Sequence, residues 1–344
     1  MKQKRTSADD VQKLDVMKPW IGDVPLRDFK IQHAEKVLAK LAEQDLAGAT
    51  LRGYAQVIHR VLALAVYPGK LLAHNPLPEG FLPDKGPERA KSFLYPSEEA
   101  ALLARRDVPI ERRMLFGVLA REGLRLSEAL DLTWSDIDLG RGTLSLDDNK
   151  TDDPRAWALA PDVAEALRRW RKLRPKAANV FDRARLGSDK RKLAGALRDD
   201  LRGAGVERPA LFASSDARMA LRVHDLRATF VTLALASGRS EAWVTDRTGH
   251  KSSAMVAGYK RQVRTAAELN LGWLAPLDAA IPELCEAAQP ETLPEVSRDC
   301  LEPMVWLYMT QPVSADSAVD SALCTRRDLN PHTLRYRNLN PEGV

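Results

Sequence analysis

The stretch HDLRATFVTLALASGRSEAWVTDRTGHKSSAMVAGYK, residues 224–260, joins an apolar helix to a series of polar turns. His224 and Arg227 are three positions apart, so a helix places them on one face, and the apolar run TFVTLALA can bury the opposite face. A glycine then ends the helical pattern and puts His250 in a turn. A serine pair can begin the next short helix, which carries Tyr259. The stretch therefore predicts helices whose ends carry polar side chains.

A second polar group precedes it in GLRLSEALDLTW, residues 123–134. Arg125 follows a Gly-Leu turn and points away from the leucines around it. Glu128 comes three residues later, close enough to orient the guanidinium group by hydrogen bonds. This spacing predicts a turn that leads into a short helix.

Most of the remaining sequence has helical periodicity, found at 26–44, 49–66, 98–106 and 110–122. The exception lies at GTLSL (142–146) and RAWALA (155–160), where apolar residues alternate as in strands. The turn-rich segment DDNKTDDP between them predicts a β-hairpin with Lys150 in its turn.

Each motif is common by itself, but their order and spacing together resemble the catalytic domain of tyrosine recombinases, the phage-integrase family. The matching pieces are G-L-R-L-S-E at 123–128, N-K-T at 149–151, H-D-L-R at 224–227, G-H at 249–250 and Tyr259, nine residues after His250. The resemblance covers about 96–274 and extends more loosely to 15–80. Thr248 stands where Leu usually precedes Gly-His, and we expect no catalytic consequence of this departure.

The resemblance implies a mainly α fold with a small antiparallel β-hairpin or sheet (α+β). In that fold a helical core-binding domain and a catalytic domain form a C-shaped clamp around DNA. We accordingly predict a core-binding domain at 1–80, a Pro-rich linker at 81–95 and a catalytic domain at 96–281. The acidic tail, 282–344, is expected to be poorly ordered.

The resemblance also implies a site-specific DNA recombinase that integrates or excises a mobile element. Such an enzyme cleaves and rejoins DNA strands through a 3′-phosphotyrosyl intermediate. Tyr259 is the expected nucleophile. Arg125 and Arg227 are expected to hold the non-bridging oxygens of the phosphate, and His250 to add another donor.

Two further roles concern proton transfer. His224 is the expected base, and Lys150 the general acid that protonates the leaving 5′ oxygen. Glu128 is expected to support Arg125. The covalent link conserves the energy of the broken bond, so the reaction requires no ATP, metal or other cofactor. The sequence contains no nucleotide-binding G-x-x-x-x-G-K-[ST] loop and no H-E-x-x-H metal motif.

The charge distribution indicates a polyanionic partner. The net charge is +5, but residues 275–344 hold 5 Arg, no Lys and 11 Asp plus Glu, so this part carries −6 and the rest +11. A body this basic suits double-stranded DNA with core recombination sites. The candidate DNA contacts are Arg52, Gln56, Arg60, Lys85, Arg89 and Lys91.

The family resemblance implies a homotetramer on two DNA duplexes, and we expect a monomer without DNA. In that assembly the segment after the tyrosine packs on a neighbouring protomer. The candidate for this exchange is 265–280, and the alternative is that it docks on its own chain.

The N-terminus lacks the apolar region of a signal peptide, and no apolar run reaches the roughly 18 residues of a membrane span. A cytoplasmic protein with no membrane association is expected. The three cysteines, all in the last 60 residues, match no zinc pattern. Three alternatives remain open: a type IB topoisomerase that relaxes DNA, a catalytically inactive DNA-binding relic, and a metal-dependent transposase.

Overall fold

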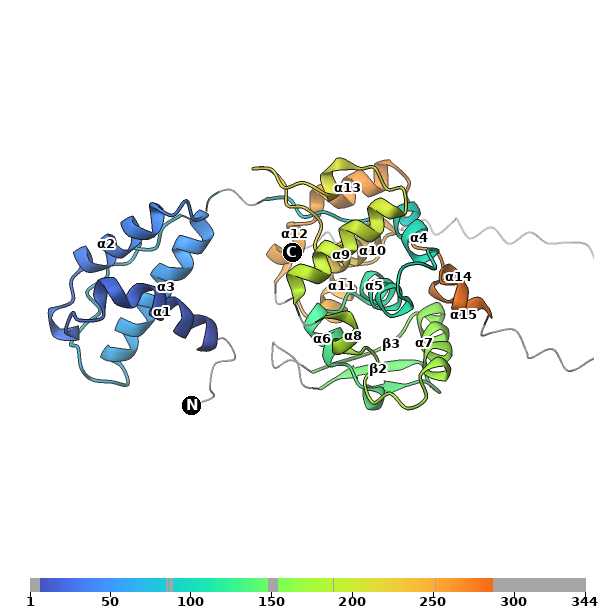
Figure 1. Ribbon diagram of the computed structural model, residues 1–344, viewed down its shortest axis with the longest axis horizontal. Coiled ribbons are helices and arrows are strands. Elements are labelled where there is room, and N and C mark those ends of the chain that lie inside the picture. The colour runs from blue at the N-terminus through green and yellow to red at the C-terminus, as the bar shows by residue number, and fades with distance from the viewer. Residues whose placement is uncertain are drawn as a thin grey trace, which may run out of the picture. The chain divides into compact units, whose positions relative to one another are not determined.

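The computed structural model describes residues 7–84, 86, 89–147, 154–187, 189–250 and 252–286 (Figure 1). Most of these residues are helical, and the strands among them form one small sheet. The buried apolar side chains form separate clusters, one within 17–77 and the others within 93–284. The predicted mainly helical fold with a small antiparallel sheet is therefore confirmed. None of the described helices is long and apolar enough to cross a membrane.

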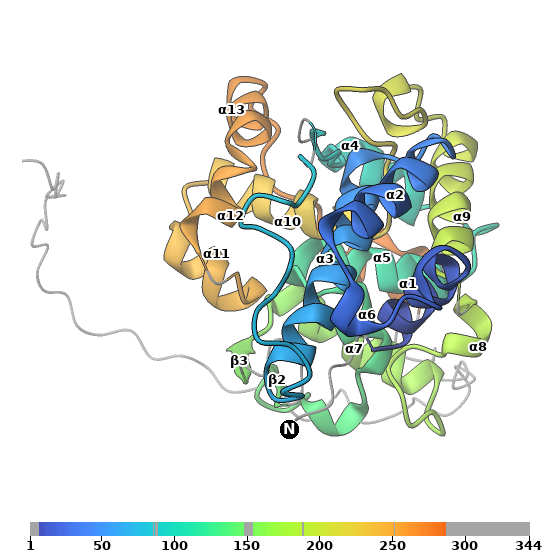
Figure 2. The ribbon, with the colours of Figure 1, turned by 90° about the vertical axis from the view of Figure 1, so that its left-hand side faces the viewer.

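The first cluster is built by α1 (Ser7–Ile21), α2 (Ile31–Ala42) and α3 (Gly48–Val66), which pack against one another (Figure 2). Buried residues of α2 recur every three or four positions, as at Val37 and Leu41, so one face of the helix is apolar. Helix α1 is not among the predicted helices. Its sequence is rich in charged residues, and its apolar face is short: Met17 is buried, with Leu14, Trp20 and Ile21 packed beside it.

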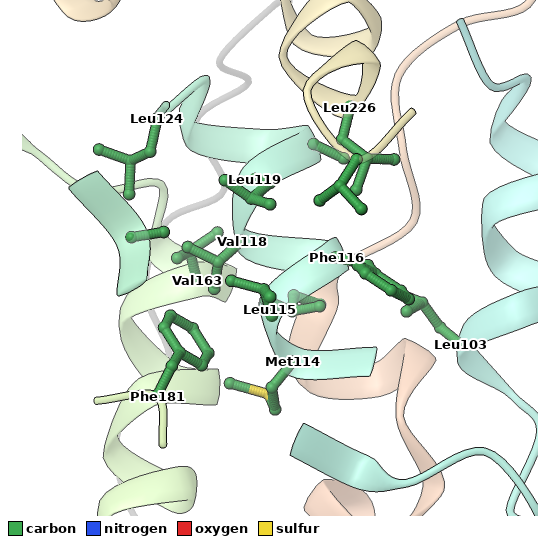
Figure 3. Close-up of a cluster of buried hydrophobic side chains, with 14 of the residues drawn as sticks. Leu103, Met114, Leu115, Phe116, Val118, Leu119, Leu124, Val163, Phe181 and Leu226 are labelled. Atoms are coloured by element: carbon green, nitrogen blue, oxygen red, sulfur yellow. The ribbon is translucent and has the colours of Figure 1, made fainter. Parts of the chain in front are cut away.

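The larger cluster surrounds α5 (Ile110–Glu122), which packs against α4 (Pro96–Leu103) and α10 (Asp225–Ala236). Every residue from Arg113 to Glu122 is buried. Figure 3 shows Phe116 and Leu119 of α5 among apolar side chains that come from several other elements. Because α5 is covered on all sides, its two ends are fixed points from which the neighbouring turns start.

The charged residues of α5 are buried together with partners. Arg121 Nη1 lies 2.5 Å from Glu99 Oε1, and both side chains are almost fully buried. Glu122 accepts hydrogen bonds from Trp157 Nε1 at 2.7 Å and from the backbone N–H of Ala160 at 3.0 Å. Burial raises the pKa of Glu122 to about 7. Buried charges of this kind are tolerated because each one has a hydrogen-bond partner.

The sheet contains β1 (Ile137–Asp138), β2 (Thr143–Leu146) and β3 (Arg155–Ala158), all antiparallel and in that order. Residues alternate between the two faces, and β3 turns Arg155 and Trp157 toward the interior. The short strand β1 is an addition to the predicted hairpin.

The other elements connect or cover these helices and the sheet. They are η1 (Leu26–Asp28), α6 (Leu126–Asp131), η2 (Trp134–Asp136), α7 (Pro161–Leu173), α8 (Arg183–Leu186), α9 (Lys190–Gly203), η3 (Pro209–Leu211), α11 (Glu241–Thr248), α12 (Ser253–Ala257), α13 (Lys260–Glu268), α14 (Leu277–Ala280) and α15 (Pro282–Glu286).

The segment after α13 folds back on its own chain. Helices α14 and α15 pack on α7, and Leu277 and Leu284 are fully buried. The end of the predicted exchange segment, 265–280, is thus docked on its own chain in this structure. The predicted tail begins at residue 282, where the structure has α15, and 287–344 lie outside the described residues.

Candidate active site

The first arginine of the site comes from the turn that ends α5. Gly123 has a φ of 65°, and a Cβ there would lie 2.4 Å from the Phe230 ring, so the turn requires glycine. Two residues later, Arg125 is the N-cap of α6. Glu128 accepts from the backbone N–H of Arg125 at 2.8 Å and from its Nη1 at 2.5 Å. One carboxylate therefore holds Arg125 at two points, its backbone N–H and its guanidinium group.

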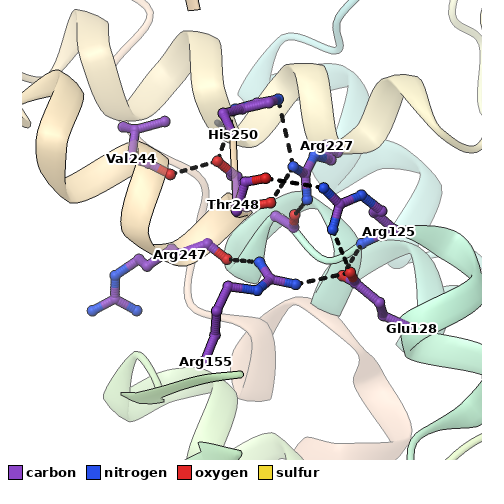
Figure 4. A network of polar contacts seen from close by, with 10 residues as sticks. Arg125, Glu128, Arg155, Arg227, Val244, Arg247, Thr248 and His250 are labelled. Atoms are coloured by element: carbon purple, nitrogen blue, oxygen red, sulfur yellow. Dashed lines mark hydrogen bonds and ion pairs between the residues drawn. The ribbon is translucent and has the colours of Figure 1, made fainter. Parts of the chain in front are cut away.

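The second arginine lies in the first turn of α10 and is 3% exposed. Arg227 donates from Nη1 to the carbonyl of Gly123 at 2.7 Å and from Nη2 to the carbonyl of Thr248. Arg125 donates from Nη2 to the carbonyl of Gly249 at 3.1 Å. Each arginine is thus hydrogen-bonded to a turn that belongs to another motif (Figure 4).

The turn that carries His250 begins at Gly249, whose φ of 61° ends α11. The Thr248 hydroxyl lies 2.8 Å from His250 Nδ1, and Arg227 Nη2 lies 3.4 Å from Nε2. Burial, and then the charges of Arg227 and Arg125, lower the pKa of His250 to about 3. Thr248 contacts the site through its hydroxyl, which meets His250, and through its backbone carbonyl, which accepts from Arg227. That the threonine has no catalytic consequence stays a prediction.

Arg155 belongs to the same network and is absent from the sequence prediction. This buried arginine of β3 donates from Nη2 to Glu128 Oε1 at 2.8 Å and from Nη1 to the carbonyl of Arg247 at 2.5 Å. A Cβ at Gly249 would lie 3.1 Å from Arg155 Nε, so the glycine also makes room for this side chain. Arg155 therefore ties the sheet to both the Arg125 turn and the His250 turn.

The charges of this network do not balance locally. Arg125, Arg155 and Arg227 surround Glu128, which makes ion pairs with the first two. Burial works against ionisation of Glu128, but hydrogen bonding by Arg125 and the nearby Arg155 charge outweigh it and lower its pKa. Burial and the Arg125 charge lower the pKa of Arg227, although an arginine stays protonated at neutral pH. The cluster thus carries an excess of buried positive charge, which favours an anion.

A hollow of about 410 Å³ opens beside this cluster. Arg125 and His224 line it together with Arg191 of α9 and Arg222. Partial burial, followed by the charge of Arg227, lowers the pKa of His224. His224 is therefore neutral at physiological pH, the form of an imidazole that can accept a proton.

Tyr259 precedes α13 and is 3% exposed, packed with Phe230, Val231 and Val244. Its ring centroid lies 6.1 Å from that of His250. Lys91 Nζ lies 4.1 Å from the centroid of the Tyr259 ring, a cation–π contact. The structure thus brings five of the six predicted catalytic residues into one region: Arg125, His224, Arg227, His250 and Tyr259.

A model of the phage integrase family matches residues 92–265, half of the 344-residue chain. The chain belongs to the phage integrase family. This confirms the resemblance to tyrosine recombinases that the motifs indicate. All five residues brought together by the fold lie within the matched part of the chain.

Solved integrase structures have the same fold. A lambda integrase dimer bound to a COC′ core site has a TM-score of 0.58 and 18% identity, over 76% of this chain and 73% of that one. A lambda integrase tetramer bound to a Holliday junction has a TM-score of 0.58 and 18% identity, over 75% and 72%. The Tn1549 transposon integrase in complex with transposon right end DNA has a TM-score of 0.58 and 18% identity, over 78% and 94%. No curated protein sequence matches the chain.

The other predicted residues of the chain have varied surroundings. Lys150 and Lys85 lie outside the described residues. Arg52 donates to the carbonyls of Leu82 and Pro83, and Arg60 is paired with Asp10, so both guanidinium groups have partners within the chain.

Gln56 and Arg89 are exposed, whereas Lys91 lies against the predicted nucleophile rather than in an open linker. Among the described residues, no cluster of three or more His, Cys, Asp and Glu side chains is placed to hold a metal.

Proposed function

We propose that this integrase is a site-specific DNA recombinase. In this proposal it cleaves and rejoins DNA strands through a 3′-phosphotyrosyl intermediate and thereby integrates or excises a mobile element. The observation that carries the proposal is the excess positive charge around Glu128, next to Tyr259. A DNA phosphate placed between the partly buried Arg125 and the buried Arg227 offsets the repulsion between these two cations.

The two arginines suit this phosphate because their hydrogen bonds to the protein are already formed. Negative charge grows on the non-bridging oxygens as the phosphate is attacked, and preorganised donors stabilise it without further rearrangement. A guanidinium group meets two oxygens at once, which a lysine ammonium does not. Arg125 and Arg227 therefore act as the clamp, and His250 lies beside the same phosphate.

In the proposed reaction the hydroxyl oxygen of Tyr259 attacks phosphorus, and the bond to the 5′ oxygen breaks. The tyrosine proton passes to His224, whose lowered pKa keeps it in the accepting form. Lys150 is assigned the role of the general acid that protonates the 5′ oxygen, because it occupies the lysine position of the family pattern. The phosphotyrosyl bond then reacts with the 5′ hydroxyl of another strand, so the proposed cycle uses no ATP, metal or other cofactor.

The proposed partner is double-stranded DNA with core recombination sites, and the proposed active form is a homotetramer on two duplexes. The lambda integrase tetramer on a Holliday junction and the Tn1549 integrase–DNA complex support this proposal by their fold. The exposed Gln56 and Arg89 are the better-placed DNA contacts. Arg52 and Arg60 are already engaged within the chain.

The proposal can be tested by trapping with suicide substrates, which are nicked duplexes of candidate core sites from the DNA that flanks the gene. A covalent protein–DNA adduct is expected with the wild type, resistant to EDTA, and absent with Tyr259→Phe. Recombination of two sites by the same protein separates a recombinase from a topoisomerase, which relaxes a plasmid instead. If no core site gives an adduct, the protein is better described as an inactive DNA-binding relic.

A further inference from the structure

Thr248 makes two short polar contacts that determine where its single hydroxyl hydrogen lies. Its Oγ1 is 2.6 Å from the carbonyl oxygen of Val244 and 2.8 Å from His250 Nδ1. A carbonyl oxygen only accepts hydrogen bonds, so the hydroxyl hydrogen must point to Val244. The hydrogen of the second contact therefore belongs to His250 Nδ1, and the hydroxyl oxygen accepts it.

The opposite nitrogen of the imidazole agrees with this assignment. His250 Nε2 lies 3.4 Å from Arg227 Nη2, and a guanidinium nitrogen only donates. A neutral imidazole has one N–H, so a hydrogen on Nδ1 leaves a lone pair on Nε2, facing Arg227. Both ring nitrogens thus meet partners that suit the same tautomer.

The charges around His250 keep the ring neutral in the free protein. The groups that face it come from four elements: Arg227 and His224 at the start of α10, Arg125 at the start of α6, Lys91 before α4 and Tyr259 before α13. Protonation of the ring would add another cation to this group. The low pKa of His250, which burial and then Arg227 cause, is the expected result.

We propose that Thr248 is a positioning residue that fixes His250 as the Nδ1–H tautomer, so that Nε2 faces the DNA phosphate without a hydrogen and can accept a proton from solvent. The second half of this inference rests on the proposed function. A hydrogen bond from Nε2 to a phosphate oxygen then requires that the ring first take up a proton from solvent. Phosphate binding supplies the negative charge that makes this uptake favourable.

The tautomer can be measured without DNA, by two-bond ¹H–¹⁵N correlation on the full chain labelled with ¹⁵N-histidine. The signals of His250 are those that disappear in His250→Gln. Wild type and Thr248→Ser are expected to have a protonated Nδ1 and an unprotonated Nε2. Thr248→Val, which removes the hydroxyl at nearly constant volume, is expected to move the hydrogen partly or fully to Nε2. A wild-type ring protonated at Nε2 overturns the proposal, and that outcome requires only the assignment variant, His250→Gln, to fold.

The effect on the reaction is measured as the single-turnover rate of cleavage of a suicide substrate at pH 6, 7 and 8. The ratio of the Thr248→Val rate to the wild-type rate is expected to rise with pH, because only the wild type must take up a proton. A ratio that stays constant over this range rejects the proton-acceptor role of Nε2. If the wild type cleaves no core site, the result counts against the proposed function. The tautomer measurement uses no DNA, so it still tests which nitrogen of His250 carries the hydrogen.

Discussion

The two arginines of the clamp and the nucleophile are held in different ways. Arg125 and Arg227 each donate directional hydrogen bonds to backbone carbonyls, and Glu128 adds a buried carboxylate. Tyr259 is held by apolar packing and by the ammonium of Lys91 over its ring, between the five-residue helix α12 and α13. Directional bonds fix a group in one orientation, whereas packing contacts are non-directional. The difference indicates that directional hydrogen bonds orient the phosphate clamp, whereas packing positions the nucleophile.

The strongest test of this contrast is Arg227→Lys. A lysine ammonium cannot bond the carbonyls of Gly123 and Thr248 and also two phosphate oxygens, so we expect cleavage to slow by about 10²- to 10³-fold. Single-turnover adduct formation on a suicide substrate measures the rate, and a DNA-binding assay serves as the control for affinity. Near-normal cleavage by this variant would show that the clamp does not depend on the fork of the guanidinium group.

A smaller effect is expected for Arg155→Met, which does not remove a group from the clamp itself. Glu128 and the Arg247 carbonyl each lose a donor, and we expect cleavage to slow by about 10- to 100-fold. Arg141→Met, at a side chain that is 85% exposed near the same sheet, is the control. The effects of Arg155→Met and Glu128→Gln should not add, because both act on one network. Fully additive losses contradict the positioning role of Arg155.

The smallest effect is expected on the nucleophile side, for Lys91→Met. This change keeps the aliphatic stem and removes the charge over the Tyr259 ring, and we expect cleavage to fall by about fivefold. Arg89→Met removes an exposed charge two residues away and serves as the control for general DNA attraction. If Lys91→Met is as damaging as Arg227→Lys, the contrast between a hydrogen-bonded clamp and a packed nucleophile is lost.

The sequence motifs identify those residues whose local geometry is determined within a few positions. Gly123 and Gly249 occupy left-handed turns that favour glycine, and His224 and Arg227 are related by the helical repeat. Glu128 is three residues from Arg125 and could be paired with it on spacing alone. The hairpin was likewise readable from its alternation, since β2 and β3 lie within the predicted stretches.

Other parts of the site depend on contacts between residues that are distant in sequence. Arg155 reaches Glu128 across 27 positions, and only the register of β3 brings it there. Lys91 was predicted as a DNA contact, which stays a prediction, and the fold places its ammonium over Tyr259, 168 residues later. Arg52 and Arg60 were predicted as DNA contacts from charge, and the folded chain supplies partners for both. Charge and periodicity alone do not tell which acceptor a long basic side chain will meet.

The paired hydrogen bonds between the glycine turns and the arginines also concern how the site opens. Arg227 bonds the carbonyl of Gly123, and Arg125 bonds the carbonyl of Gly249. If the Gly123 turn unfolds locally, the Gly249 carbonyl loses its Arg125 donor. If the Gly249 turn unfolds, Arg125 and Arg227 lose the carbonyl acceptors of Gly249 and Thr248. The two turns, more than 120 positions apart, therefore form a single cooperative unit, whose backbone amides should exchange with solvent at a common opening free energy.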